Sequence, residues 1–155
     1  MKKFNVLIVG CGNIAGGYDS SDDDSNNILT HAKAFKLHKG FFLCGCVDPN
    51  IKALKNFSDY WGIDRTYSNL NDALKDNIKY DVISICSPTS SHYIDLKMSI
   101  NAKPKLIFCE KPIADNINDA KKIVNICKDL KIELAVNHTR RWNKNIQKFK
   151  HELNL

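Results

Sequence analysis

The glycine-rich segment Gly10-Cys11-Gly12-Asn13-Ile14-Ala15 is the first whose residue types and spacing could do chemistry. It follows an apolar run, Phe4–Gly10, and leads into helical sequence, so it fits the G-x-G-x-x-A pattern of a dinucleotide-binding loop. Gly10 permits a tight turn, Gly12 lets the backbone approach a pyrophosphate, and Ala15 lets helix and strand pack closely. We expect a helix to begin here, and its free amides, at Asn13 and Ile14, to bind phosphate. A plain glycine turn is the alternative.

Asp48 is the second candidate, because it directly follows the apolar run Phe41–Val47 in VDPN. An acid at this place can accept hydrogen bonds from the adenosine ribose and repels a 2′-phosphate, which favours NAD over NADP. Asp48 lies farther from the glycine motif than the usual spacing of about 20 residues. The acidic segment 19–27 accounts for most of the excess. Asp48 could instead be a turn aspartate, and Lys52 leaves room for NADP.

Ser87-Pro88-Thr89-Ser90-Ser91-His92 follows a third apolar run, DVISIC. Residues beyond the carboxyl ends of parallel strands line the cofactor crevice of such folds, so Ser87, Pro88 and Thr89 are candidate cofactor contacts. Ser90 or Ser91 can cap the next helix. Taken alone, His92 is better explained as a histidine in the first turn of that helix.

Cys109-Glu110-Lys111-Pro112 ends a fourth apolar run. Glu110 and Lys111 at this edge can reach a nicotinamide ribose or a substrate hydroxyl. A lysine so placed can relay a proton during alcohol oxidation, which makes Lys111 the candidate catalytic residue. A surface Glu–Lys pair before a helix is the alternative.

Short apolar runs alternating with helical patterns must position these segments. This order predicts an α/β fold, a doubly wound parallel sheet (Rossmann fold) in a single domain. The helix expected at 116–130 should bury Ile123, Ile126, Cys127 and Leu130. Strands are expected at 4–10, 41–47, 65–67, 81–86, 105–109 and 133–137; helices are expected at 50–61, 69–76, 90–101 and 116–130, with caps at Asn69 and Asn116.

Composition limits the class of protein. With 155 residues, 43% of them hydrophobic and 26% charged, the chain is long enough for one globular domain. The net charge of +6 lies mostly in the segment 139–155, which argues against a nucleic-acid partner. No run approaches the about 20 apolar residues of a membrane span, so we expect no membrane partner.

The six cysteines lack the paired spacing of a zinc site or a disulfide framework. They lie in apolar runs, so we predict buried reduced thiols, a cytoplasmic location and no metal ligand among them. Cys44 and Cys46 should share one face of their strand.

The motifs GCGNIA, VDPN, SPTSSH, CEKP and VNHTRRW together resemble the Gfo/Idh/MocA oxidoreductases, over essentially the whole chain as that family's N-terminal domain. The resemblance implies hydride transfer between a nicotinamide dinucleotide, with NAD favoured over NADP, and a sugar, nucleotide-sugar or cyclitol hydroxyl. It implies that Lys111 lies beside nicotinamide and substrate, with Glu110 and Pro112 in the same wall. It also implies that the loop of His92 contacts the cofactor and that Asn137 and Arg140 lie near cofactor or substrate.

Two departures from that family matter. The acidic segment between Gly17 and Thr30 splits a helix that His31 resumes. We expect a solvated loop, with a lid or a metal-binding loop as the alternatives.

The second departure is length. We expect residues 1–138 to form the dinucleotide-binding domain and 139–155 to begin the bridge to a C-terminal substrate and oligomerisation domain that is absent from this sequence. An amphipathic C-terminal helix is expected there, and its exposed apolar stripe would favour self-association, as in a homo-oligomer, or partner binding: Trp142, Ile146, Phe149 and Leu153. The alternative function is a truncated non-catalytic dinucleotide-binding or interaction module, so we expect cofactor binding without appreciable turnover.

Overall fold

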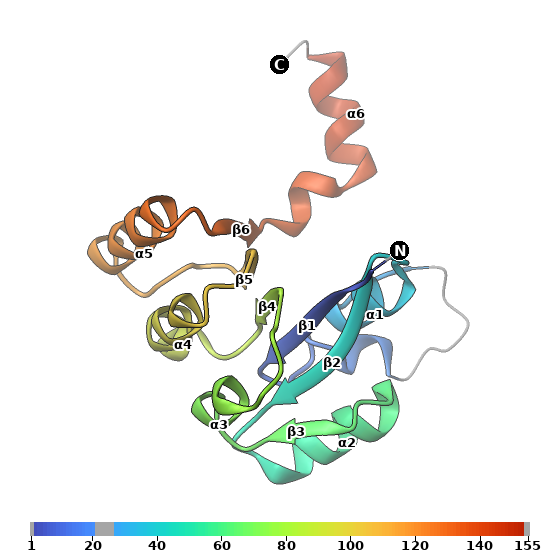
Figure 1. Cartoon of the computed structure of the whole chain (residues 1–155). Helices are drawn as coiled ribbons and strands as arrows, with labels where there is room; N and C mark the ends of the chain where they lie inside the picture. Colours follow the sequence, from blue (N-terminus) through green and yellow to red (C-terminus); the bar gives the residue numbers. More distant parts are fainter. Residues whose placement is uncertain (1, 21–26, 154–155) are drawn as a thin grey trace.

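A computed structural model describes residues 2–20 and 27–153 of the chain. These residues form one parallel sheet of six strands in the order β3-β2-β1-β4-β5-β6 (Figure 1). The sequence-predicted strands are confirmed, with ends that differ by at most a few residues. The strands are β1 Phe4–Val9, β2 Phe41–Val47, β3 Arg65–Tyr67, β4 Val82–Ile85, β5 Leu106–Glu110 and β6 Glu133–Asn137.

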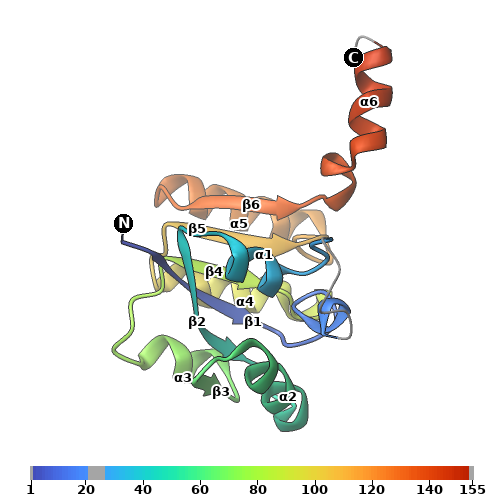
Figure 2. The ribbon, with the colours of Figure 1, turned by 90° about the vertical axis from the view of Figure 1, so that its right-hand side faces the viewer.

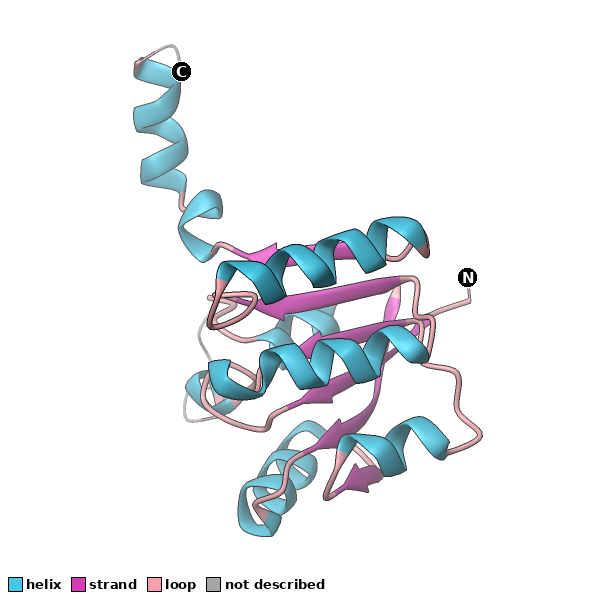
Figure 3. Ribbon diagram, turned by 90° about the vertical axis from the view of Figure 1, so that its left-hand side faces the viewer, coloured by secondary structure: helices cyan, strands magenta, loops and turns pink. Residues whose placement is uncertain are grey.

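Helices cover both faces of the sheet, which confirms the doubly wound prediction. One apolar cluster joins the sheet to α1 and α2, and a second joins it to α3, α4 and α5. In Figure 2, α1 lies in front of the sheet with α4 and α5 behind it, and Figure 3 shows the opposite face. The helices are α1 His31–Leu37, α2 Ile51–Trp61, α3 Leu70–Lys75, α4 Thr89–Asn101, α5 Ile117–Asp129 and α6 Lys144–Glu152, with short 3-10 helices η1 Gly17–Asp19 and η2 Thr139–Trp142.

Most helix starts follow the local signals. The side chains of Asn69 and Asn116 cap α3 and α5 by accepting the backbone N–H groups of Asp72 and Asp119. The predicted cap at Ser90 or Ser91 is wrong. α4 begins one residue earlier, at Thr89, directly after Pro88, so both serines lie inside the first turn. Proline has a backbone φ that suits this position, and no side chain caps α4.

Helix α5 buries less than its pattern predicts. Ile123 and Cys127 are buried, whereas Ile126 and Leu130 are 38% and 47% exposed. The prediction for those two residues is wrong, because α5 packs beside β6, which is an edge strand of the sheet as described here. A helix over an edge strand has a neighbour on only part of its apolar stripe.

Strand β2 contains a bulge that separates two cysteines. Val6 pairs with Leu43 and Leu7 pairs with Gly45, so Cys44 is an extra residue between the two registers. Cys44 therefore faces the α3–α5 side and Cys46 the α1–α2 side. The expectation that they share one face is wrong. All six cysteines are free and buried, as predicted.

The C-terminal helix α6 extends away from the sheet (Figure 1). Ile146, Phe149 and Leu153 on its stripe are 44%, 61% and 50% exposed, so the expected amphipathic helix forms with its apolar face uncovered. Trp142 does not belong to it, because η2 contains Trp142 and α6 begins only after the Asn143 cap. No helix of the described residues is long and apolar enough to cross a membrane.

The expected helix directly after the glycine motif is replaced by a turn that leads into η1. Gly16 N–H donates to the Gly12 carbonyl at 3.2 Å, but no regular α-helix follows before residue 31. Helix α1 then resumes the interrupted one, as predicted. The amides of His31 and Ala32 donate to the carbonyls of Ile14 and Ala15, at 3.3 and 2.8 Å.

Asp19 corrects the prediction of a wholly solvated acidic segment. Its side chain is buried and accepts hydrogen bonds from the Thr30 hydroxyl (2.6 Å), the Leu29 amide (3.1 Å) and Lys33 Nζ (3.4 Å). Burial alone would raise the pKa of Asp19, and these donors overcome it and hold the pKa below its ordinary value. One carboxylate thus joins η1 to the cap of α1. Asp22, Asp23 and Asp24, on which the lid and metal alternatives rest, lie outside the described residues.

We expect Asp19→Asn to lower the free energy of unfolding by about 1–3 kcal/mol near pH 7, because a buried ionic hydrogen-bond acceptor is lost. The lowered pKa means that wild type has its full advantage above the ordinary carboxyl value of about 4 and loses it as the pH falls through the lowered value. Urea unfolding at pH 7 and at acidic pH measures both effects. Asp59→Asn, at an exposed pair with Lys55, is the matched control. Equal effects of the two substitutions would contradict the anchoring role of Asp19.

Candidate functional site

Gly10 forms the turn at the carboxyl end of β1, between β2 and β4. Its amide donates to the Val47 carbonyl at 2.8 Å, and its φ is +90°, which L side chains rarely adopt. A Cβ at Gly10 would lie 2.6 Å from the backbone nitrogen of Ser87. Glycine is therefore required where the loop after β1 passes the loop after β4.

Gly12 differs from Gly10, because a Cβ on it would meet nothing within 4 Å. Among the residues described, the backbone N–H groups of Gly12, Asn13 and Ile14 donate to no acceptor. Ala15 is fully buried against the α1–α2 core, as its packing role predicts. Open space above adjacent unpaired amides fits the oxygens of a pyrophosphate.

Asp48 lies beside this loop. Its Oδ2 accepts the Cys11 amide and its Oδ1 accepts the Asn50 amide, each at 2.8 Å. Each carboxylate oxygen keeps a further lone pair, so Asp48 can still accept a ribose hydroxyl. It lines a cavity of about 460 Å³, whose wall includes Val9, Gly10, Asp48, Pro49, Ser68, Asn69, Leu70, Asn71, Ser87, Pro88, Asp95 and Met98.

A second cavity, of about 340 Å³, lies on the other side of the turn at Ser87 and Pro88, which line both. It brings together most of the remaining predicted residues. Its wall consists of Ile14, Tyr18, Ser87, Pro88, Thr89, His92, Glu110, Lys111 and Thr139. The two cavities and the glycine loop with its unpaired amides lie at one sheet edge, at the point where the strand order reverses, which is where doubly wound sheets bind dinucleotides.

His92 ties two of these loops together. The ring is 1% exposed, and its Nε2 and Nδ1 lie 2.8 Å from the Ser87 carbonyl and 2.6 Å from the Pro112 carbonyl. The Ser87 hydroxyl also donates to Asp95 at 2.6 Å, and burial raises the pKa of Asp95. His92 thus fixes the walls of the second cavity through backbone carbonyls.

Glu110 is largely buried at the end of β5, while the next residue, Lys111, is exposed. Glu110 Oε1 accepts His31 Nε2 at 2.8 Å and Asn137 Nδ2 at 2.6 Å. Burial alone would raise the pKa of Glu110, but the hydrogen bonds from His31 and Asn137 hold it below its ordinary value. The site therefore contains a fixed carboxylate next to a lysine whose ammonium is free to reach a ligand.

Several predicted residues line neither of these two cavities: Gly12, Asn13, Ala15, Pro112, Asn137 and Arg140. Asn137 sits behind Glu110, to which it is paired across β5 and β6. Arg140 is exposed in η2 and lines neither of the two cavities.

Several lining residues were not predicted. The turn Ser68–Asn71 follows the carboxyl end of β3, so the rule applied to the other strands would have found it. Asp95 and Met98 lie inside α4, where an apolar or acidic residue gives no local sign of a cavity. His31 and Ser84 contact the site from α1 and β4, and only their position as polar residues in otherwise buried segments could have marked them.

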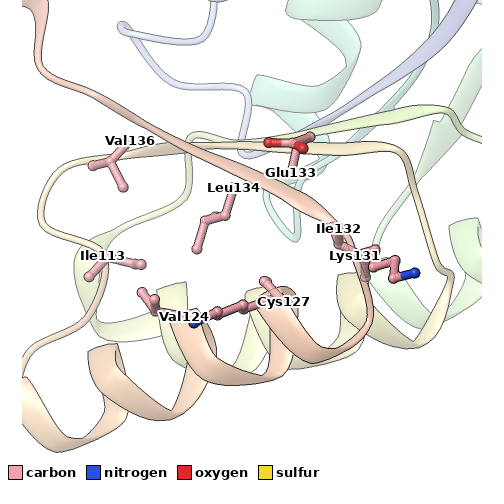
Figure 4. Close-up of a pocket in the computed structure, with 9 residues that line it drawn as sticks. Ile113, Val124, Cys127, Lys131, Ile132, Glu133, Leu134 and Val136 are labelled. Carbon is pink, nitrogen blue, oxygen red and sulfur yellow. The ribbon is translucent and has the colours of Figure 1, made fainter.

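A larger hollow, of about 590 Å³, lies elsewhere, between α5 and β6 (Figure 4). Aliphatic side chains such as Val124, Leu134 and Val136 line it, and Glu133 is the only acid in its wall. It contains none of the predicted site residues and no paired acid and base, so its chemistry does not match that of the sheet edge.

Comparisons with known proteins agree with this geometry. Residues 4–138 match the family model for the Gfo/Idh/MocA oxidoreductases, described as an oxidoreductase family with an NAD-binding Rossmann fold. The chain is 29% identical over 150 residues to a D-apiose dehydrogenase of Rhizobium rhizogenes, covering 97% of this chain and 39% of that protein. It is 25% identical over 120 residues to a myo-inositol 2-dehydrogenase of Thermotoga maritima, covering 77% of this chain and 35% of that protein.

Two solved structures superpose on nearly the whole chain. An oxidoreductase from Agrobacterium radiobacter in complex with NAD+, L-tartaric acid and magnesium gives a TM-score of 0.84 at 26% identity, covering 99% of this chain and 40% of that one. The WlbA dehydrogenase from Bordetella pertussis in complex with NADH and UDP-GlcNAcA gives 0.81 at 25% identity, covering 99% and 42%. The chain thus spans about two fifths of the length of these proteins.

We expect Gly10→Ala to lower the free energy of unfolding by about 1–3 kcal/mol, because it forces a left-handed residue and a backbone clash with Ser87. Gly12→Ala, made in open space, should change it by no more than about 0.5 kcal/mol. Chemical denaturation of both variants beside wild type measures the difference. If both substitutions change the free energy of unfolding equally little, the backbone of Ser87 does not approach Gly10 as closely as the structure shows.

Proposed function

Because this chain belongs to the Gfo/Idh/MocA oxidoreductase family, we propose that it binds NAD and supplies the cofactor half of a dehydrogenase site. The dehydrogenase would act on a hydroxyl of a sugar, nucleotide sugar or cyclitol. One observation carries the proposal. Two cavities, one beside Asp48 and one beside Lys111, share Ser87 and Pro88, and the glycine loop, which lines the first with Gly10 and the second with Ile14, has unpaired amides at Gly12–Ile14.

The residues divide into two groups along this edge. Asp48 would accept the adenosine ribose hydroxyls, and the amides of the glycine loop would bind the pyrophosphate. The wall formed by Thr89, His92 and Glu110 would hold the nicotinamide end. NAD supplies the hydride acceptor for alcohol oxidation when it is bound.

Lys111 is the proposed catalytic residue. It is exposed and lines the second cavity, and no hydrogen bond or ion pair among the described residues occupies its ammonium. It can therefore hold or move the proton of a substrate hydroxyl. Glu110, Pro112, Asn137 and Arg140 are proposed to shape or approach the same end, Asn137 through its bond to Glu110.

The substrate class rests on the relatives. Those named above are dehydrogenases of D-apiose and myo-inositol and a dehydrogenase solved with UDP-GlcNAcA. All these ligands carry adjacent hydroxyl groups, and a polar cavity ending in a lysine suits a hydroxyl. We also place the protein in the cytoplasm, since its cysteines are free thiols, and expect self-association through the uncovered face of α6.

Calorimetric titration of the chain with NAD+ tests the proposal. We expect saturable binding to wild type, and loss of that binding in Gly12→Val, whose side chain fills the open space above the amides while the fold is retained. Circular dichroism verifies that the variant folds. Absence of NAD+ and NADP+ binding by wild type at about 1 mM, a free energy weaker than about −4 kcal/mol, would refute the proposal.

Asp48 should set the preference between the two cofactors. We expect wild type to bind NAD+ more tightly than NADP+. Asp48→Asn should reduce the ratio of the NADP+ and NAD+ dissociation constants by about tenfold, because the repulsion of the 2′-phosphate is lost. Parallel titrations with both dinucleotides measure the ratio. The control Asp59→Asn, on the exposed surface of α2, should leave it unchanged. An unchanged ratio in Asp48→Asn would contradict this role.

A further inference from the structure

A buried cluster of polar side chains lies directly behind the Lys111 end of the site. His31, the first residue of α1, contacts the Ser84 hydroxyl through Nδ1 and Glu110 Oε1 through Nε2, each at 2.8 Å. Asn137 Nδ2 reaches the same oxygen at 2.6 Å. His31 is 3% exposed and Ser84 fully buried, so water does not substitute for these contacts. This polar cluster joins α1, β4, β5 and β6 at one point.

The geometry sets the direction of the hydrogen bonds. An ionised carboxylate has no proton to donate, so Glu110 Oε1 accepts the hydrogen bonds from His31 and Asn137. The lowered pKa of Glu110 agrees with the ionised state. His31 Nε2 and Asn137 Nδ2 lie 3.3 Å apart because both donate to one oxygen. With Nε2 protonated, a neutral His31 accepts the Ser84 hydroxyl at Nδ1. The Glu110 carboxylate thus selects the tautomer with its N–H at Nε2, and the Ser84 hydroxyl, as the partner of Nδ1, holds the ring in that orientation.

This arrangement bears on Lys111 through the backbone. Glu110 is the last residue of β5 and directly precedes Lys111, and the backbone amide of Lys111 is among the groups that lower the pKa of the Glu110 carboxylate. The Lys111 ammonium has no partner among the described residues, so its position depends on the strand end that Glu110 fixes. A Glu110 that lost its donors would have to turn toward solvent, and Lys111 would move with it.

The inserted segment places His31 at this point. The His31 amide donates to the Ile14 carbonyl, a position that Tyr18 would hold in an uninterrupted helix. Thr30, just before it, caps α1 and is held by Asp19. The insertion therefore exchanges Tyr18, which is exposed at the wall of the second cavity, for a buried histidine behind it.

We infer that His31, oriented by Ser84, is a positioning residue that fixes the Glu110 carboxylate and thereby the nicotinamide end of the site. It acts there and not at the Asp48 end. The inference rests on the proposed NAD-binding function. A histidine that merely stabilises the fold is the competing explanation, since removing one partner of a buried pair also destabilises a protein.

A comparison of two ligands separates these explanations. ADP-ribose contains the adenosine and pyrophosphate of NAD+ but not the nicotinamide. We expect wild type to bind NAD+ more tightly than ADP-ribose, and His31→Ala to reduce that preference by about tenfold while its affinity for ADP-ribose stays within about twofold. Titration calorimetry of the full chain with each ligand measures both affinities.

Three further variants complete the test. His31→Gln, which can still donate to Glu110, should restore part of the preference, and Ser84→Ala, which only frees the ring, should lose part of it. Ser84→Ala also keeps the inference testable if His31→Ala does not fold. His38→Ala makes the same substitution at the exposed end of α1 and should leave both affinities unchanged.

The outcomes are distinct. If His31→Ala and Ser84→Ala each lose affinity for NAD+ and ADP-ribose to the same extent, the role of His31 is structural and the inference is overturned. An unchanged preference, or a wild type that binds the two ligands equally, overturns it as well, because nothing then acts at the nicotinamide end. If wild type binds neither ligand, the proposed function itself fails and the inference falls with it.

Discussion

A buried carboxylate needs hydrogen-bond donors to replace the water that it loses. Two such carboxylates organise the region around the candidate site. Asp19 takes donors from Leu29, Thr30 and Lys33, and Glu110 takes them from His31 and Asn137. Consecutive residues at the start of α1, Thr30 and His31, thus serve different carboxylates. This short helix is therefore held at its first turn by two different carboxylates, although residues 20–30 separate it from η1 along the sequence. The position of α1 on the sheet depends on charge satisfaction as much as on the packing of Phe35.

Features set by local sequence could be predicted. The apolar runs that form β1 and β4 are largely buried on both faces, as central strands of parallel sheets are, so the residue pattern along the chain predicted their positions. The loops after these strands share one edge, and this places Gly10, Asp48 and Lys111 along the same sheet edge without knowledge of any contact between them. The caps at Asn69 and Asn116 are equally local, because an asparagine side chain bonds an amide three residues on.

Features that depend on residues distant in sequence could not be predicted. The bulge at Cys44 arises from pairing with β1 and changes the face of every residue after it, which no pattern within β2 reveals. Periodicity marks Ile126 and Leu130 as apolar, but burial requires a neighbour, and α5 lies over an edge strand. The partners of Glu110 come from α1 and β6, so its burial and its charge state emerge only when these elements meet.

Glu110 and Lys111 are adjacent in sequence but have opposite environments, and this difference separates their chemical roles. Glu110 is engaged by several donors, and its pKa lies below the ordinary value, so near neutral pH it holds no proton that it could give to a ligand. Taking up a proton would also weaken the hydrogen bonds that its Oε1 accepts from His31 and Asn137. Lys111 has no such bond among the described residues, is exposed and lines the cavity. This contrast supports the proposal that Lys111 moves the proton and that Glu110 is the fixed charge at the end of β5.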